Sequence, residues 1–149
     1  FAPDSSPDSW RVTEKLSAEY GVPVGIHNHG GAHWLGSSEI LRHIFKNTDA
    51  SIGLCLDTAW ALDAGENPVG MADEFADRLY GLHLKDFVFD RSRRQEDVVI
   101  GTGNLDLPAL VKRIIANDNV KSCVIEYEGD SANPVPALKE CVQRLIDLC

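Results

Sequence analysis

Four short apolar segments of the chain each end in polar residues that can take part in chemistry. They span residues 22–29, 51–57, 80–86 and 122–126. Each is short for a helix and apolar on both faces, which is typical of a buried strand in a parallel sheet. Parallel α/β folds keep their functional groups at the carboxyl ends of the strands. The pattern therefore predicts strands whose polar ends meet at one edge of a sheet.

Between these segments, apolar residues recur at the three-to-four-residue spacing of amphipathic helices. The predicted helices begin near Pro7, Ser38, Pro68, Asp106 and Pro134. The first follows a capping serine, carries Val12, Leu16 and Tyr20 on its apolar face, and ends at Gly21. Residues 58–65 and the polar residues 90–97 are predicted to be loops.

The predicted order is one helix, then a strand and a helix repeated, which implies a parallel sheet with right-handed crossovers. An isolated sheet of this kind would leave both edge strands unpaired. We therefore predict an α/β fold, the C-terminal half of a (β/α)8 TIM barrel, with helix 4 and strands 5 to 8. On this interpretation residues 1–149 are a single domain, a C-terminal fragment of such a barrel.

Composition excludes several classes of partner. The net charge of -9 opposes binding to a nucleic-acid backbone, which depends on clustered lysine and arginine. No apolar run approaches the roughly 20 residues that cross a bilayer, so we expect a soluble protein with no membrane partner. The 4 cysteines lack the C-x-x-C spacing. They are typical of free thiols in a reducing compartment, so we expect a cytoplasmic location.

Asp57, His83 and Glu126 stand at the ends of successive predicted strands. Each has an ordinary explanation when taken alone: a helix cap, a core histidine and a solvated strand end. Together, carboxylates and neutral imidazoles at converging strand ends favour a site for one divalent metal ion, Mn²⁺, Mg²⁺, Co²⁺ or Zn²⁺. Glu128, two residues beyond Glu126, is the second choice for the last ligand.

Four motifs strengthen this interpretation. They are Leu-Asp-Thr at 56–58, His-Leu-Lys-Asp at 83–86, Gly-Thr-Gly-Asn-Leu-Asp at 101–106 and Val-Ile-Glu at 124–126. In this order they resemble the xylose isomerase-like TIM-barrel superfamily of sugar phosphate isomerases and epimerases. In that family Glu, Asp, His and Glu on strands 5 to 8 hold one divalent metal ion. The resemblance implies that Asp57, His83 and Glu126 are the last three of these ligands.

The chain departs from the family pattern at two of these strands. His27 stands where the strand-5 glutamate is common, so the resemblance implies that His27 is the fourth metal ligand. His29 stands where the family has a histidine that contacts the substrate. The strand-6 motif, often Asp-Thr-x-His, ends here in Trp60, which would offer a flat apolar wall to a sugar.

The resemblance also implies a reaction. A base removes the proton next to a carbonyl group of a metal-bound substrate, and Glu126 or His29 is the expected base. Lys85 is expected to act on a substrate oxygen, or else to form a salt bridge with Asp86. Asp86 is itself expected to contact the substrate. The expected enzyme is an isomerase or epimerase of a small keto sugar or sugar phosphate. The alternative is a dehydratase of an inosose-like or dehydroshikimate-like substrate.

Other features leave two interpretations open. Arg91, Arg93 and Arg94 could clamp a phosphate or lie on a solvated loop. The turn at residues 101–104 could offer N–H groups to an anion or simply precede a helix. His33 and Trp34 are candidates for a lid, and His43 is expected to be structural. Besides the carbohydrate substrate, a second copy of the chain is a possible partner, because the strand edges would otherwise stay unpaired.

Overall fold

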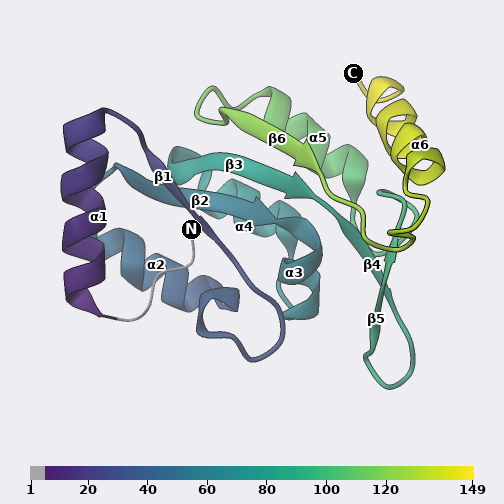
Figure 1. Cartoon of the computed structure of the whole chain (residues 1–149), viewed down its shortest axis with the longest axis horizontal. Helices are drawn as coiled ribbons and strands as arrows, with labels where there is room; N and C mark the ends of the chain where they lie inside the picture. Colours follow the sequence, from purple (N-terminus) through teal and green to yellow (C-terminus); the bar gives the residue numbers. More distant parts are fainter. Residues whose placement is uncertain (1–5) are drawn as a thin grey trace.

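A computed structural model describes residues 6–149, and its centre is a parallel sheet (Figure 1). The four strands are β1 (Val24–His27), β2 (Ile52–Asp57), β3 (Leu79–Leu84) and β6 (Ser122–Ile125). They are ordered β1-β2-β3-β6, and each pair is parallel. This arrangement confirms the predicted parallel α/β sheet, and all the polar strand ends lie at one edge.

Five helices match the predicted ones. They are α1 (Pro7–Tyr20), α2 (Ser38–Asn47), α4 (Pro68–Glu74), α5 (Leu107–Ile115) and α6 (Val135–Ile146). Local capping sets several of their starts, because an oxygen of the preceding side chain accepts a free N–H of the first turn. Asn67 does this for α4 and Asp106 for α5. Short 3-10 turns, η1 (Trp34–Gly36) and η2 (Ala76–Arg78), lie between the main elements.

The two faces of the sheet have different environments. Ile26, Leu54 and Leu82 alternate onto one face, where they pack with residues of α2, α4 and α5 and are fully buried. Figure 1 shows α4 and α5 behind the strands. The opposite face carries Gly25, Cys55 and Gly81, and a hollow of about 520 Å³ opens there, lined also by His27 and His83. The core therefore lies on the helical side, and the functional groups lie on the other.

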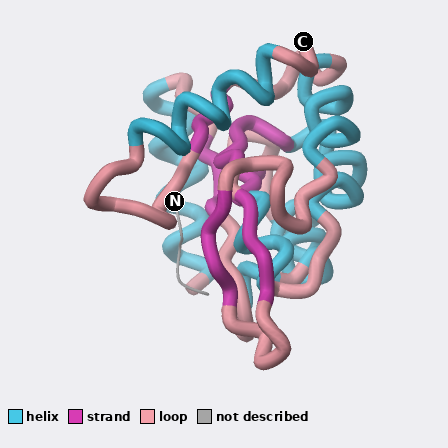
Figure 2. The backbone as a smooth tube through the Cα atoms, turned by 90° about the vertical axis from the view of Figure 1, so that its right-hand side faces the viewer, coloured by secondary structure: helices cyan, strands magenta, loops and turns pink. Residues whose placement is uncertain are grey.

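Two predicted loops contain regular structure. Residues 58–63 form the helix α3 (Thr58–Asp63), because the Oδ1 atom of Asp57 accepts the N–H of Trp60 at 2.9 Å and caps the first turn. Residues 86–98 form an antiparallel hairpin of β4 (Asp86–Phe89) and β5 (Gln95–Val98). Figure 2 shows this hairpin projecting from the body of the protein. The loop predictions hold for residues 64–65 and 90–94 and were wrong for the rest, because short or exposed elements lack a clear apolar period.

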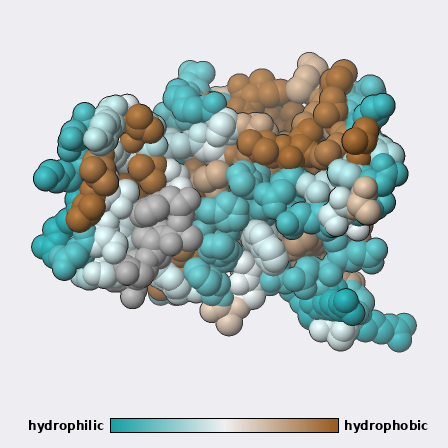
Figure 3. Space-filling model, in the orientation of Figure 1, coloured by the Kyte–Doolittle hydropathy of each residue, from teal (hydrophilic) through white to brown (hydrophobic). Residues whose placement is uncertain are grey.

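The apolar face predicted for α1 is largely exposed. Val12, Leu16 and Tyr20 are 56%, 46% and 71% exposed. A second apolar surface lies over β6 and α6, where Val124 and Ile146 are 49% and 62% exposed. Figure 3 shows hydrophobic residues gathered in both places. Among residues 6–149, no helix combines the length and the apolar character that crossing a bilayer requires.

Candidate metal centre

Four side chains converge at the carboxyl ends of the four parallel strands. One nitrogen or oxygen atom from each lies within 4.8 Å of the other three; the residues are His27, Asp57, His83 and Glu126. The register pairs Asp57 with His83, and the rings of His27 and His83 are 4.9 Å apart. The structure thus brings together the residues that were proposed as metal ligands from the sequence.

Asp57 carries the clearest sign of a missing partner. Its side chain is fully buried, and while Oδ1 caps α3, Oδ2 makes no hydrogen bond within the described part of the chain. The Nε2 atom of His27 lies 3.6 Å from this oxygen, and Nδ1 of His27 also lacks a partner there. Unpaired buried polar atoms are costly, and these are the atom types that bind divalent cations. The residues present therefore fit a divalent metal ion.

Asn28 fixes the backbone of Asp57 and was missed from the sequence. Its side chain is buried; the amide donates to the carbonyl of Asp57 at 3.0 Å, and its oxygen accepts the N–H of Asp57 at 2.7 Å. This pair of bonds continues the β1–β2 ladder beyond the last residue of β1. The sequence signal that could have indicated this role is the position of Asn28 between two histidines at the end of an apolar segment.

Glu126 presents its two oxygens to different partners. Oε2 lies 2.7 Å from Nδ1 of His83, and Oε1 accepts a hydrogen bond from Nζ of Lys85 at 2.7 Å. Burial alone would raise the pKa of Glu126, but the hydrogen bonds and charges of Lys85 and His83 outweigh it and lower the pKa. Glu126 is therefore an anion. One of its oxygens is directed at the other three members of the cluster, and the ammonium group of Lys85 holds the other.

Lys85 does not pair with Asp86, contrary to one of the two expectations. Its side chain is fully buried, and its ammonium contacts Glu126, Glu128 and Asp97. Burial acts to lower the pKa of Lys85, yet the hydrogen bonds that it donates to Glu126 and Glu128 more than offset this and raise the pKa. Lys85 is thus a cation whose ammonium holds Glu126, and its expected contact with a substrate oxygen stays a prediction.

Asp86 also takes its partners from within the chain. It is fully buried, and its carboxylate accepts four backbone N–H groups at 2.9 Å, those of Gly101, Gly103, Asn104 and Leu105. A Cβ at position 103 would lie 2.6 Å from Oδ1 of Asp86, so glycine is required there. The backbone of residues 101–105 thus occupies the carboxylate of Asp86, and the expected substrate contact by Asp86 stays a prediction. The N–H groups of this turn bind the protein's own carboxylate rather than a ligand.

Sequence comparison places this geometry in a family. A family model described as xylose isomerase-like TIM barrel matches residues 7–148. The chain belongs to this family. It is 28% identical over 163 residues to an inosose dehydratase of Geobacillus kaustophilus, covering 96% of this chain and 53% of that protein. It is 25% identical over 114 residues to a 3-oxo-isoapionate decarboxylase of Pectobacterium atrosepticum, covering 73% of this chain and 40% of that protein.

Solved structures of the xylose isomerase-like type share the fold. A zinc-binding IolI protein superposes with a TM-score of 0.74 at 16% identity, covering 95% of this chain and 54% of that one. A xylose isomerase domain protein of Planctomyces limnophilus gives 0.73 at 21% identity, with 99% and 55% covered. The chain spans about half the length of the curated relatives and solved structures that it matches. These likenesses confirm the predicted fold class.

In this xylose isomerase-like chain, His29 lies beside the cluster. Its ring is 5.3 Å from the ring of His27 and 4.4 Å from that of His33. Burial lowers the pKa of His29, and so do its neighbours His33 and His27. Trp60, on α3, packs edge-on against Phe87 at 5.3 Å and lies 5.7 Å from Nζ of Lys85. The two expected substrate contacts, His29 and Trp60, thus lie next to different members of the site.

The other candidates lie elsewhere. The residues 91–94 form the exposed turn of the hairpin, where the guanidinium of Arg93 covers the ring of Phe89 at 4.6 Å. Trp34 packs against Trp10 of α1 at 6.5 Å, so it belongs to the helical side and is not a lid. Glu128 contacts Lys85 and is not one of the four convergent donors. His43 is exposed on α2.

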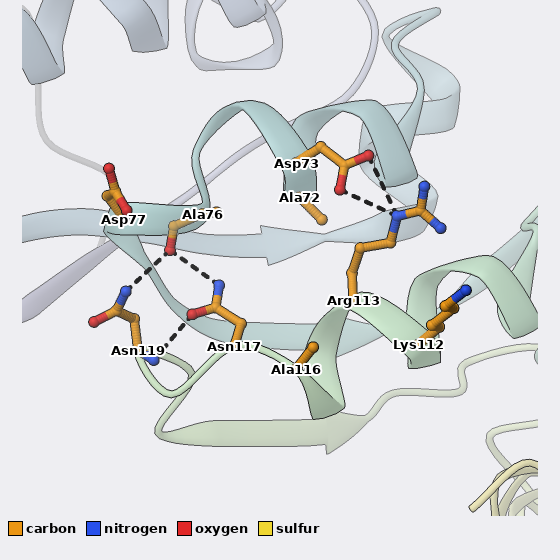
Figure 4. A pocket seen from close by; sticks show the side chains of 9 residues that line it. All are labelled: Ala72, Asp73, Ala76, Asp77, Lys112, Arg113, Ala116, Asn117 and Asn119. Carbon is orange, nitrogen blue, oxygen red and sulfur yellow. Dashed lines mark hydrogen bonds and ion pairs between the residues drawn. The ribbon is translucent and has the colours of Figure 1, made fainter.

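A separate hollow of about 450 Å³ lies between α4 and α5 (Figure 4). Its walls are joined by their own polar groups. Arg113 pairs with Asp73, and the amides of Asn117 and Asn119 donate to the carbonyl of Ala76. These residues precede β3 and β6, far along the strands from the convergent donors. We assign this hollow no part in the chemistry.

Proposed function

We propose that the chain carries the metal site of a divalent-metal-dependent enzyme that removes a proton next to the carbonyl group of a small keto sugar. An isomerase or epimerase acting on the sugar or its phosphate is the first candidate. The observation that supports the proposal is the convergence of His27, Asp57, His83 and Glu126 around the unpaired Oδ2 of Asp57. We further propose a cytoplasmic location, from the cysteine pattern alone.

The metal would be held by two imidazoles and two carboxylates. Such a mixed nitrogen and oxygen set suits Mn²⁺, Co²⁺ or Zn²⁺ better than Mg²⁺, which prefers oxygen ligands and retains water. When bound, the ion would polarise the substrate carbonyl and acidify the adjacent C–H group. Asp57 and Glu126 would also balance the charge of the ion.

We assign the role of base to His29. Both oxygens of Glu126 already have partners: Oε1 accepts a hydrogen bond from Lys85, and Oε2 lies against His83. This carboxylate is therefore poorly placed to take a proton from a substrate. His29 lies next to His27 without being one of the four convergent donors. Trp60 would offer an apolar wall to the sugar.

A dehydratase is the second candidate, favoured by the curated relatives named inosose dehydratase. After removal of the same proton, the hydroxyl group on the next carbon can depart as water once it takes up a proton, which the protonated His29 would return to it. The residues assigned above would serve both reactions equally well. The choice therefore depends on the substrate and on whether it carries a hydroxyl group that can leave once the proton is removed.

One experiment tests the proposal and separates the two candidates. The full-length protein is incubated with Mn²⁺ in D₂O with a panel of ketoses and inososes, and the products are followed by NMR. Deuterium uptake next to the carbonyl without loss of water identifies an isomerase or epimerase, whereas loss of water identifies a dehydratase. His29→Asn should abolish both without preventing Mn²⁺ binding, and His43→Asn is the matched control. A wild-type protein that neither binds Mn²⁺ nor exchanges deuterium refutes the proposal.

A further inference from the structure

The hairpin contributes a residue to this site that the sequence motifs did not indicate. We propose that Asp97 of β5 is a positioning residue, which holds the ammonium of Lys85 against Glu126 and thereby directs the other oxygen of Glu126 at the metal. The inference rests on the proposed metal site. It assigns the β4–β5 hairpin a functional role in addition to a structural one.

The contacts around Lys85 single out Asp97. The ammonium is 2.7 Å from Oε1 of Glu126 and 3.5 Å from Oδ2 of Asp97, and it also contacts Glu128. The side chain of Glu128 is 67% exposed, whereas that of Asp97 is 9% exposed. Water screens an exposed carboxylate and lets it move, so its hold on a cation is weak. Asp97 is therefore the partner that can keep Lys85 in one place.

Asp97 is itself fixed to the segment that follows Glu126. Its Oδ2 accepts the N–H of Glu128 at 3.1 Å. A Cβ at position 129 would lie 2.6 Å from the carbonyl oxygen of Asp97, so only glycine allows the two backbones to approach so closely. β5 and the end of β6 thus form one unit around the ammonium. Movement of the hairpin would move Lys85 and Glu126 together.

This unit determines how Glu126 is presented. With Oε1 held by Lys85, Oε2 points at His83, another of the four convergent donors. If Asp97 loses its charge, the ammonium keeps only Glu126 and the exposed, mobile Glu128 as charged partners. It can then move away from Oε1 of Glu126 together with Glu128, which lets the Glu126 side chain rotate. Metal binding must then order that side chain again, which costs conformational entropy. The expected effect is weaker metal binding without a change in the four ligands.

The variant Asp97→Asn tests this chain of contacts, because asparagine keeps the shape and an oxygen that accepts the N–H of Glu128. Glu96→Gln is the matched control, an exposed carboxylate on the same strand. Titration with Mn²⁺ should show about tenfold weaker binding for Asp97→Asn, the lower end of effects seen when residues that orient metal ligands are changed. Glu96→Gln should bind like the wild type. Unchanged affinity in Asp97→Asn overturns the inference.

A double-mutant cycle separates positioning from a general loss of structure. In a Lys85→Met background, Asp97→Asn should change the Mn²⁺ affinity by less than about twofold, because its effect passes through the missing ammonium. An equal loss in both backgrounds means that Asp97 acts through the fold, and the inference fails.

A measurement without metal gives an independent test. The protons of the buried Lys85 ammonium should exchange slowly enough to be seen by ¹⁵N NMR, and they should exchange faster in Asp97→Asn than in Glu96→Gln. Equal exchange in the two variants overturns the inference even if Asp97→Asn proves too unstable to titrate. Failure of the wild type to bind Mn²⁺ would instead refute the proposed function, and this inference with it.

Discussion

Replacing Asp57 with asparagine should weaken metal binding and, at the same time, stabilise the metal-free protein. The change leaves Oδ1 to cap α3 and replaces the unpaired Oδ2 by an amide group. That amide can donate to Nε2 of His27, which lies 3.6 Å from Oδ2. An unsatisfied buried polar atom costs about 1–3 kcal/mol, so the free energy of unfolding should rise by up to that amount.

The metal affinity should change in the opposite direction. Binding to four-ligand zinc sites is worth about 10–16 kcal/mol, so one ligand contributes about 3 kcal/mol, which corresponds to more than a hundredfold in affinity. Urea denaturation of the metal-free protein gives the first quantity and titration with Mn²⁺ or Zn²⁺ gives the second. A site selected for binding rather than for stability should show this opposition.

The control for this experiment is Asp106→Asn. Asp106 also caps a helix, since its Oδ1 accepts the N–H of Ala109 at 3.1 Å, but it is exposed and is not among the four convergent donors. Asparagine caps helices about as well as aspartate, so both quantities should stay close to wild type. The reasoning is refuted if Asp57→Asn keeps wild-type metal affinity, or if it destabilises the metal-free protein.

Two further measurements test the fold. Asp86→Asn should lower the free energy of unfolding, measured by urea denaturation, by about 3–6 kcal/mol. The new amide group would face two of the four N–H donors, so two hydrogen bonds to a charged group would be lost. A decrease below about 1 kcal/mol would contradict this prediction. The isolated 149-residue chain should dimerise or aggregate, because the edge strands β1 and β6 leave backbone groups unpaired. Size-exclusion chromatography with light scattering tests this, and a stable, active monomer would contradict it.

Much of the fold could be predicted from the sequence because its signals are local. Short apolar runs, the spacing of amphipathic helices and helix caps are local sequence patterns, and they correctly predicted the parallel sheet and its five main helices. The meeting of Asp57, His83 and Glu126 was also predictable from the sequence, since each closes a parallel strand and such ends converge. α3 and the hairpin escaped because a short helix and an exposed pair of strands lack that periodic signal.

Which partner each polar group takes was decided only by the tertiary structure. Lys85 and Asp86 are adjacent in sequence, yet one turns to carboxylates from β5 and the end of β6, and the other to the backbone of residues 101–105. Asn28 bonds to Asp57 across 29 positions. Buried polar groups must find partners wherever the folded chain supplies them. Sequence spacing therefore placed the candidate metal ligands at the strand ends, and only packing between distant segments determined which residues hold them there.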